Sequence, residues 1–198
     1  ILSRGLELCA LTDGALDLTA YSAVQAWGFP TGAYRVPDET ELEQLVGTID
    51  YTQVELDEQT GQARLSDGMS LDLGAVAKGF AAREAEAAIR DAGGTSAMLD
   101  LGGNVTVIGA KEDGSPWRVA VKDPRDTSSY LCVLALTNVT LSTSGGYERY
   151  FEEDGVRYHH IIDPETGYPA DSGLLSVTVV SADHLLADAL STALFVAG

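Results

Sequence analysis

Helix-like and strand-like segments are segregated along this sequence and do not alternate. Apolar residues recur at helical spacing in the early part of the chain, and a segment rich in Ala, Glu and Arg runs from 78 to 91. Short strand-like runs then dominate until a last helical segment at 183–196. Elements that cluster in this way favour an α+β fold over a doubly wound parallel sheet. We therefore expect a single α+β domain over residues 1–198, with mainly antiparallel sheets and flanking helices.

Local signals place the individual elements. Helices are expected at 1–11, 18–27, from 38 onward, at 78–91 and at 183–196. Strands are expected at 53–56, 62–65, 96–101, 105–108, 117–121, 130–137, 138–142, 147–152, 156–162 and 176–180. Asp38 and Glu41 form a capping-box pattern, and Gly93 is suited to a left-handed helix end. Asp154-Gly155 predicts a two-residue hairpin turn.

The acidic balance of the chain restricts its partners. Twelve Lys and Arg residues against thirty Asp and Glu residues give a formal net charge of −18. A field of this sign opposes binding to nucleic acid and to anionic membrane surfaces. An anionic nucleotide would need a cation between its phosphates and the protein.

The two cysteines both lie in apolar stretches of sequence. Cys9 stands between Leu and Ala, and Cys132 stands between Leu and Val. Free cysteines in such surroundings usually behave as small buried hydrophobes. We expect two buried free thiols.

The last third of the chain carries candidate metal ligands. Asp188 and Thr192 are spaced i, i+4, so they share one face of the expected helix. Hard oxygen ligands suit Mg²⁺, which usually meets a protein through few groups plus a phosphate. No Lys or Arg follows Arg157, so a buried Asp188 has no ion-pair partner nearby in sequence. A bound metal ion is the simplest partner for its charge. A polar stripe on the helix is the alternative interpretation.

The segment Asp72–Phe80 joins an acidic residue, a small-residue turn and Lys78 at the expected start of a helix. A cation is misplaced there, because a helix start already carries positive partial charge. A phosphate would resolve the conflict, since backbone N–H groups and the Lys78 ammonium both favour it. An ordinary strand-to-helix turn with Lys78 in water fits equally well.

Two further patterns suggest a ligand site. Gly102-Gly103 after a strand would let a flat ligand approach the backbone, although a simple β-turn explains the same pair. His159 and His160 are adjacent in an expected strand and so face opposite sides, which weighs against one zinc ion binding both. A histidine with a pKa near neutrality is the usual general base, whereas a structural histidine is the alternative.

Five segments occur in the order seen in the FAD:protein FMN transferases, a family formerly called thiamine-biosynthesis lipoproteins. They are Asp72–Ala81, Leu101–Asn104, Thr143–Glu148, His160–Pro164 and Ala187–Ala193. Gly14–Thr19 and Trp27–Phe29 also resemble upstream landmarks of that family. The resemblance spans essentially the whole chain.

This resemblance implies Mg²⁺-dependent transfer of FMN from FAD to a Thr or Ser hydroxyl of an acceptor protein, with release of AMP. The implied acceptor is a protein such as a subunit of a membrane redox complex. The implied metal ligands are the Ala75 carbonyl, Asp188, the Ser191 carbonyl and Thr192. The candidate FAD contacts are Ala15, Leu16, Asp17, Asp72, Lys78, Gly102, Gly103, Ser144 and Ile162. His160 is implied to take the proton from the acceptor hydroxyl.

The sequence also departs from the family pattern. Gly146 stands where the family often has a polar or acidic residue, and Asn104 where it often has Asp. A helical pattern is already under way at Ile1, so we expect a member that lacks the usual N-terminal segment. The resemblance implies a location outside the cytoplasmic membrane, with a lipid anchor on the full-length protein. A non-catalytic FAD-binding protein and a Mg²⁺-dependent FAD pyrophosphatase, in which water replaces the acceptor hydroxyl, remain open as alternatives.

Overall fold

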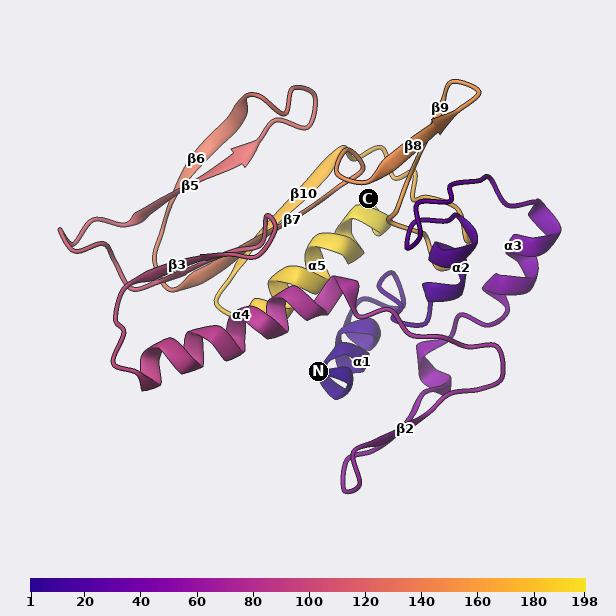
Figure 1. Ribbon diagram of the computed structural model, residues 1–198, viewed down its shortest axis with the longest axis horizontal. Coiled ribbons are helices and arrows are strands. Elements are labelled where there is room, and N and C mark those ends of the chain that lie inside the picture. The colour runs from indigo at the N-terminus through magenta and orange to yellow at the C-terminus, as the bar shows by residue number, and fades with distance from the viewer. The chain divides into compact units, whose positions relative to one another are not determined.

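A computed structural model describes all 198 residues and divides them into two compact units. Unit 1 contains 74–145 and 175–192 together with Ile1, and unit 2 contains 2–73, 146–174 and 193–198. Every pair of named strands is antiparallel. The predicted α+β class with mainly antiparallel sheets is therefore confirmed, while the expectation of a single domain stays a prediction. Figure 1 labels the elements along the chain.

Unit 1 is built on a four-stranded sheet in the order β10, β7, β4, β3. The strand bounds are β3 Ala97–Asp100, β4 Val105–Ile108, β7 Val139–Gly145 and β10 Ser176–Ser181. The inner strands β4 and β7 pair Thr106 with Thr140. Because side chains alternate between faces along a strand, Ser142 and Ser144 of β7 lie on one face and Thr143 on the other.

A second antiparallel pair in unit 1 packs its apolar face against this sheet. It consists of β5 Trp117–Lys122 and β6 Tyr130–Leu136. The shared core contains Val107, Val119, Val121 and Leu141. Cys132 lies on β6 and is exposed, so the expectation of a buried thiol is wrong there. Residues 130–133 of β6 are all exposed, because only the later part of the strand, at Leu134 and Leu136, packs against the core.

Two helices of unit 1 lie side by side next to β7 and β10, as Figure 1 shows. They are α4, Gly74–Asp91, and α5, His184–Ala197, of which residues 184–192 belong to unit 1. Gly79 sits where they meet. A Cβ at this position would lie 2.5 Å from the His184 carbonyl oxygen and 2.8 Å from the Leu185 Cα. The close approach of the helices therefore requires glycine at residue 79.

Unit 2 holds the N-terminal helices and two separate hairpins. Its elements are α1 Leu2–Leu11, α2 Tyr21–Ala26, α3 Glu39–Val46, a 3₁₀ turn η1 Tyr51–Gln53, β1 Glu55–Asp57, β2 Gln62–Arg64, β8 Tyr150–Glu153 and β9 Val156–His159. The buried core cluster comprises Ala23, Trp27, Phe29, Leu42 and Ile162. The Trp27 indole N–H donates to the Gly167 carbonyl at 2.8 Å, which ties α2 to the loop that follows β9. Cys9 is buried in α1, as predicted, and burial is the main cause that raises its pKa to about 11.

Several local signals are confirmed in the structure. The Asp38 side chain accepts the Glu41 backbone N–H and caps α3. Asp154 and Gly155 both adopt positive φ, 51° and 78°, as a two-residue hairpin turn between β8 and β9 requires. Gly93 also has positive φ, 84°, just after the last residue of α4.

Two boundaries differ from expectation in ways that bear on the site. Helix α4 begins at Gly74, four residues before the predicted start, so Lys78 lies in its second turn and not at its first residue. The electrostatic conflict expected for Lys78 is therefore weaker, because the effect of the helix dipole falls off beyond the first turn. Strand β7 extends to Gly145, three residues beyond the predicted end at 142. None of the helices has the length and apolar character needed to cross a membrane.

Replacing Gly79 by Ala tests the helix contact. In an exposed helix position this change stabilises by about 1 kcal/mol, because alanine has the higher helix propensity. At residue 79 the added methyl would collide with backbone atoms of α5, so we expect a net loss of about 1–3 kcal/mol in the free energy of unfolding. Urea unfolding measures the change, and Ala87→Gly on the exposed side of α4 calibrates the propensity effect alone. A Gly79→Ala protein as stable as the parent would contradict the contact.

Candidate metal and nucleotide site

Asp188 is a buried carboxylate held by two separate elements of unit 1. It lies one turn into α5 and is 2% exposed. Its Oδ2 accepts the Gly79 backbone N–H of α4 at 2.8 Å, and its Oδ1 accepts the Ser142 hydroxyl of β7 at 3.2 Å. An α-helix would ordinarily pair the Gly79 N–H with the Ala75 carbonyl. Asp188 therefore competes with Ala75 for one donor, which suits the prediction that this carbonyl is a metal ligand.

Hydroxyl groups from β7 and α5 surround this carboxylate. The Ser144 Oγ lies 2.9 Å from the Ser191 Oγ and 3.2 Å from the Thr192 Oγ1. The Ser142 Oγ lies 3.4 Å from the Ser191 Oγ. The structure thus brings together the predicted residues Asp188, Ser191, Thr192 and Ser144. Ser142 was missed, although its alternation with Ser144 in a strand was a signal that could have found it.

The pKa of Asp188 is raised from its ordinary value, and burial is the main cause. The Gly79 N–H, the Lys78 ammonium and the side chains of Ser142 and Asn104 act in the opposite direction without cancelling the effect of burial. The sequence had offered no basic partner for Asp188, yet the fold brings Lys78 to it from α4. A second positive charge beside the carboxylate would favour its ionised form further.

The residues present fit a magnesium ion. The cluster offers one carboxylate, several hydroxyls and backbone carbonyls, all hard oxygen donors of the kind that Mg²⁺ prefers. No group of three or more His, Cys, Asp or Glu side chains is arranged to hold a metal. Asn104 is 1% exposed, and its Oδ1 has no hydrogen-bond partner within the protein. Such a buried acceptor calls for a donor from outside the chain.

The Gly102-Gly103 turn between β3 and β4 combines a required backbone conformation with open space. Both glycines have positive φ, 66° and 89°, and both are exposed. A Cβ on either would meet nothing within 4 Å, so conformation and not crowding calls for glycine here. The turn directs the next residue, Asn104, inward, where its Nδ2 lies 3.4 Å from the Ser142 Oγ. Contact between these glycines and FAD stays a prediction.

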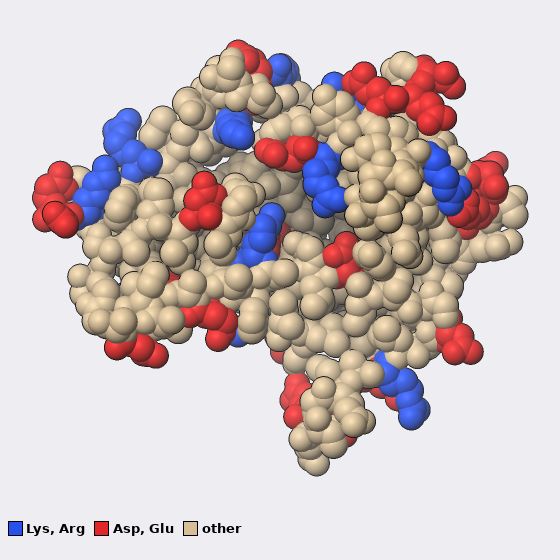
Figure 2. All heavy atoms as spheres, in the orientation of Figure 1, with Lys and Arg blue, Asp and Glu red and all other residues tan.

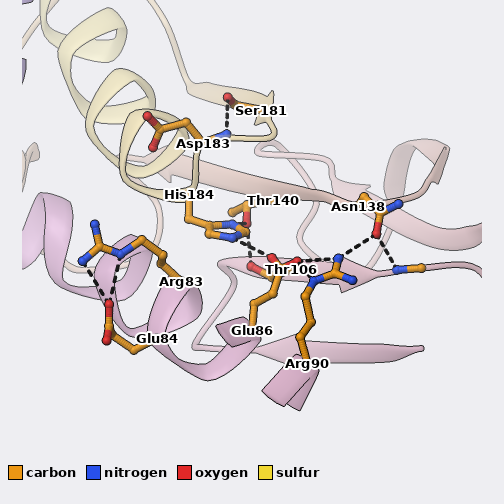
Figure 3. Close-up of polar contacts among 11 residues, drawn as sticks. Arg83, Glu84, Glu86, Arg90, Thr106, Asn138, Thr140, Ser181, Asp183 and His184 are labelled. Atoms are coloured by element: carbon orange, nitrogen blue, oxygen red, sulfur yellow. Dashed lines mark hydrogen bonds and ion pairs between the residues drawn. The ribbon is translucent and has the colours of Figure 1, made fainter. Parts of the chain in front are cut away.

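A polar network clamps α4 against α5 away from Asp188 (Figure 3). His184 Nε2 lies 2.7 Å from the Glu86 carboxylate, which also pairs with Arg90 at 2.6 Å. On its other side, His184 Nδ1 is bonded to Thr140 Oγ1, which lies 2.6 Å from Thr106 Oγ1. His184, Thr140 and Thr106 are all buried. Both ring nitrogens of His184 are engaged inside the fold, so we assign this histidine a structural role.

His160 lies in unit 2, directly after β9, with its ring orientation set by backbone contacts. The Arg149 carbonyl oxygen lies 3.1 Å from the His160 backbone N and 3.2 Å from its Nδ1. A carbonyl can only accept, so Nδ1 carries the proton, and in the neutral ring Nε2 carries the lone pair. The ring also makes an edge contact with Phe29, whose carbonyl accepts from the Arg149 guanidinium at 2.9 Å. This geometry suits Nε2 as a proton acceptor.

His159 has different surroundings, as the strand alternation predicted. Its ring packs edge-on against Phe195, and its Nε2 lies 3.1 Å from the Ala170 carbonyl oxygen. Burial is the main cause that lowers its pKa, which favours the neutral ring. A Cβ at Gly146 would lie 2.7 Å from the His159 Cδ2. The imidazole occupies the space of a side chain at 146, which accounts for glycine at that position.

The remaining predicted contacts lie in unit 2. Asp17 Oδ1 accepts the backbone N–H and the hydroxyl of Thr19, and its Oδ2 accepts the Tyr51 N–H at 3.0 Å. Leu16 and Ile162 are both buried. The Asp72 backbone N–H donates to the Leu18 carbonyl at 2.7 Å. Binding of FAD by Ala15, Leu16, Asp17, Asp72 and Ile162 stays a prediction.

Comparison with known proteins identifies the family. The ApbE family matches this sequence along residues 1–198. The chain belongs to the ApbE family. A curated ApbE-type relative, the FAD:protein FMN transferase of Haemophilus influenzae, is 33% identical over 205 residues, covering 100% of this chain and 59% of its own length. The family resemblance drawn from the ordered motifs is thus confirmed.

Solved structures of ApbE proteins share the fold. The crystal structure of the ApbE protein from Thermotoga maritima has a TM-score of 0.92 and 39% identity, covering 98% of this chain and 63% of that one. The apo flavinyl transferase ApbE of Pseudomonas stutzeri has a TM-score of 0.86 and 34% identity, covering 98% and 61%. The chain therefore spans less than two thirds of the length of these ApbE proteins.

Replacing Asp188 by Asn tests the cost of burying the charge. Because the folded-state pKa lies above the ordinary value of 3.8, the stability linked to this group is present below that value and is lost as pH rises through the folded-state pKa. Above the folded-state pKa and without metal, the charged carboxylate is therefore a destabilising group. We expect the metal-free Asp188→Asn protein to melt at a higher temperature than the parent at pH 7.

Thermal unfolding with and without Mg²⁺ measures both halves of this prediction. The ion should raise the melting temperature of the parent but not that of Asp188→Asn, because a ligand stabilises only the state that binds it. A variant that melts lower than the metal-free parent at pH 7 would contradict this prediction.

Proposed function

We propose that this chain carries out Mg²⁺-dependent transfer of FMN from FAD to a Thr or Ser hydroxyl of an acceptor protein, with release of AMP. Membership of the ApbE family and the names of the relatives support the flavin transfer. The observation that carries the chemistry is the bond of His160 Nδ1 to the Arg149 carbonyl, which leaves Nε2 as the basic nitrogen. An acceptor hydroxyl needs such a base near neutral pH.

In the proposed reaction the acceptor oxygen attacks the phosphorus of the FMN half of FAD. The bond from that phosphorus to the bridging oxygen breaks, and AMP leaves with the bridging oxygen. The hydroxyl proton passes to His160 Nε2. Lys78 offers its ammonium to the phosphates, and Asp188, Thr192 and the carbonyls of Ala75 and Ser191 would hold Mg²⁺. The ion would neutralise phosphate charge and stabilise the leaving group.

A FAD pyrophosphatase is the second candidate, because water could replace the acceptor hydroxyl at the same base. One incubation distinguishes the candidates: the protein with FAD, Mg²⁺ and a Thr-containing acceptor, analysed by mass spectrometry and by AMP release. Transfer predicts an acceptor heavier by one FMN and an equal amount of AMP. AMP with free FMN and an unmodified acceptor indicates hydrolysis, and FAD that stays intact indicates a binding protein.

The proposed location outside the cytoplasmic membrane rests on the family resemblance alone.

Replacing Lys78 by Ala tests its role toward phosphate. A charge-assisted hydrogen bond contributes roughly 1.5–3 kcal/mol, so FAD affinity should fall by about that amount. Riboflavin has no phosphate, and its affinity should change little. Flavin fluorescence titrations with both ligands measure the difference. Equal weakening of the two affinities would remove Lys78 from the phosphate site.

Replacing His160 by Ala tests the proposed base. We expect FMN transfer to fall by about 10²–10⁴-fold while FAD affinity is largely retained, because a general base acts on the reacting proton and not on binding. His159→Ala is the control, and we expect it to lower stability more than transfer. Normal transfer by His160→Ala together with inactivity of His159→Ala would move the base to His159.

A further inference from the structure

We propose that Ser142 and Asn104 are positioning residues that hold the Asp188 carboxylate in the orientation in which it binds a divalent cation. This inference rests on the proposed Mg²⁺ site and goes beyond it, because neither side chain is among the predicted ligands. Two hydrogen bonds hold the Asp188 carboxylate. One donor is a backbone N–H, and the other is a side-chain hydroxyl that a substitution can remove.

The carboxylate of Asp188 is held at both of its oxygens. The Gly79 N–H lies on helix α4, and the Ser142 hydroxyl lies on strand β7. A side chain held at one oxygen could still rotate about its carboxyl bond, whereas donors from two directions leave one orientation. Removing the Ser142 hydroxyl would therefore free this rotation while the Gly79 bond remains.

The hydroxyl of Ser142 has its own orientation set by Asn104. The Asn104 Nδ2 lies 3.4 Å from the Ser142 Oγ, and an amide nitrogen can only donate. A carboxylate can only accept. Because the serine hydroxyl carries a single hydrogen, a donor on one side and an acceptor on the other direct that hydrogen toward Asp188. The hydrogen bonds therefore run in one direction: Asn104 donates to Ser142, and Ser142 donates to Asp188.

Burial increases the effect that loss of either hydrogen bond would have on Asp188. Asn104, Ser142 and Asp188 are each at most 2% exposed, so bulk water cannot replace a lost donor. Asn104 directly follows the exposed Gly102-Gly103 turn, so it also connects these hydrogen bonds to that turn. Partners that orient a metal ligand through hydrogen bonds typically change metal affinity by about 10–100-fold when removed.

A neighbouring residue supplies a matched control. Thr143 follows Ser142 on β7 but faces the other side, where its Oγ1 lies 2.8 Å from the Thr178 Oγ1 of β10. Thr143→Val removes one hydroxyl bond from the same strand without touching the Asp188 cluster. If Ser142 merely satisfies the core, Ser142→Ala and Thr143→Val should have similar effects on every measurement.

The experiment is a titration with Mn²⁺ alone, in which the free ion is counted by its paramagnetic resonance signal. The proteins are the parent, Asp188→Asn, Ser142→Ala, Asn104→Ala, the double variant of 142 and 104, and Thr143→Val, each checked for folding by thermal unfolding without metal. We expect Ser142→Ala to raise the Kd for Mn²⁺ by about 10–100-fold. Asn104→Ala should raise it less, and the double variant should bind Mn²⁺ more weakly than Ser142→Ala, since the Asn104 side chain also acts on Asp188 directly. Thr143→Val should bind like the parent.

The outcomes separate the two proposals. If the parent and Asp188→Asn bind Mn²⁺ equally, or the parent binds none, the metal assignment is wrong and the positioning role falls with it. If the parent binds and Asp188→Asn does not, a Ser142→Ala or Asn104→Ala protein with parental affinity overturns the positioning role alone. If the affinities change as expected but the FAD assay shows no transfer, the positioning role stands and the proposed function is wrong.

Discussion

The bond between the Gly79 N–H and the Asp188 carboxylate is the contact on which the candidate metal site depends. It joins α4, which carries Ala75 and Lys78, to α5, which carries Ser191 and Thr192. It forms only because residue 79 has no side chain, since a Cβ would collide with the α5 backbone. One residue therefore both allows the helices to approach and donates to the carboxylate that the approach buries.

Burying that carboxylate costs free energy, and the fold offsets the cost only in part. Backbone, hydroxyl and ammonium groups lower the pKa of Asp188, yet burial still raises it overall. The Glu86–His184 contact supports the same pair of helices from the next turns of α4, where the polar network of Figure 3 is satisfied within the protein. The two ends of this helix contact differ. Both ring nitrogens of His184 have partners within the protein, whereas the Asp188 carboxylate would be stabilised in its ionised form by a further cation. Asp188 is therefore the group at this contact that favours a bound cation.

The overall charge makes a local cation more important. Figure 2 shows acidic side chains scattered over one face, with basic side chains between them, and the whole chain carries a formal net charge of −18. A phosphate ligand therefore meets a generally negative protein. Lys78 and the N–H groups of helix starts are favourable to phosphate, and a Mg²⁺ ion would add to them.

The sequence by itself determined the family, because its motifs resemble those of the family in the same order. It also determined the α+β class and most element positions, because these follow from local periodicity, capping and turn residues. Asp38, Gly93 and the Asp154-Gly155 turn each act within a few residues of chain, so pattern alone was enough to place them. The candidate site was only partly predictable in this way. Asp188 and Thr192 were found from their helical spacing, and His160 was chosen over its neighbour through the family motif.

Tertiary structure decided which groups meet, because such contacts join residues that are distant in sequence. Lys78 reaches the surroundings of Asp188 from a helix more than a hundred positions earlier, although sequence had offered no basic partner. Ser142 contacts Asp188 because β7 lies beside α5 in the fold. The tautomer of His160 depends on the carbonyl of a residue eleven positions away in the chain. Cys132 is exposed because only the later part of its strand, at Leu134 and Leu136, packs against the core, and its apolar sequence neighbours do not indicate this. Local patterns encode which elements form, whereas burial and hydrogen-bond partners depend on how those elements pack.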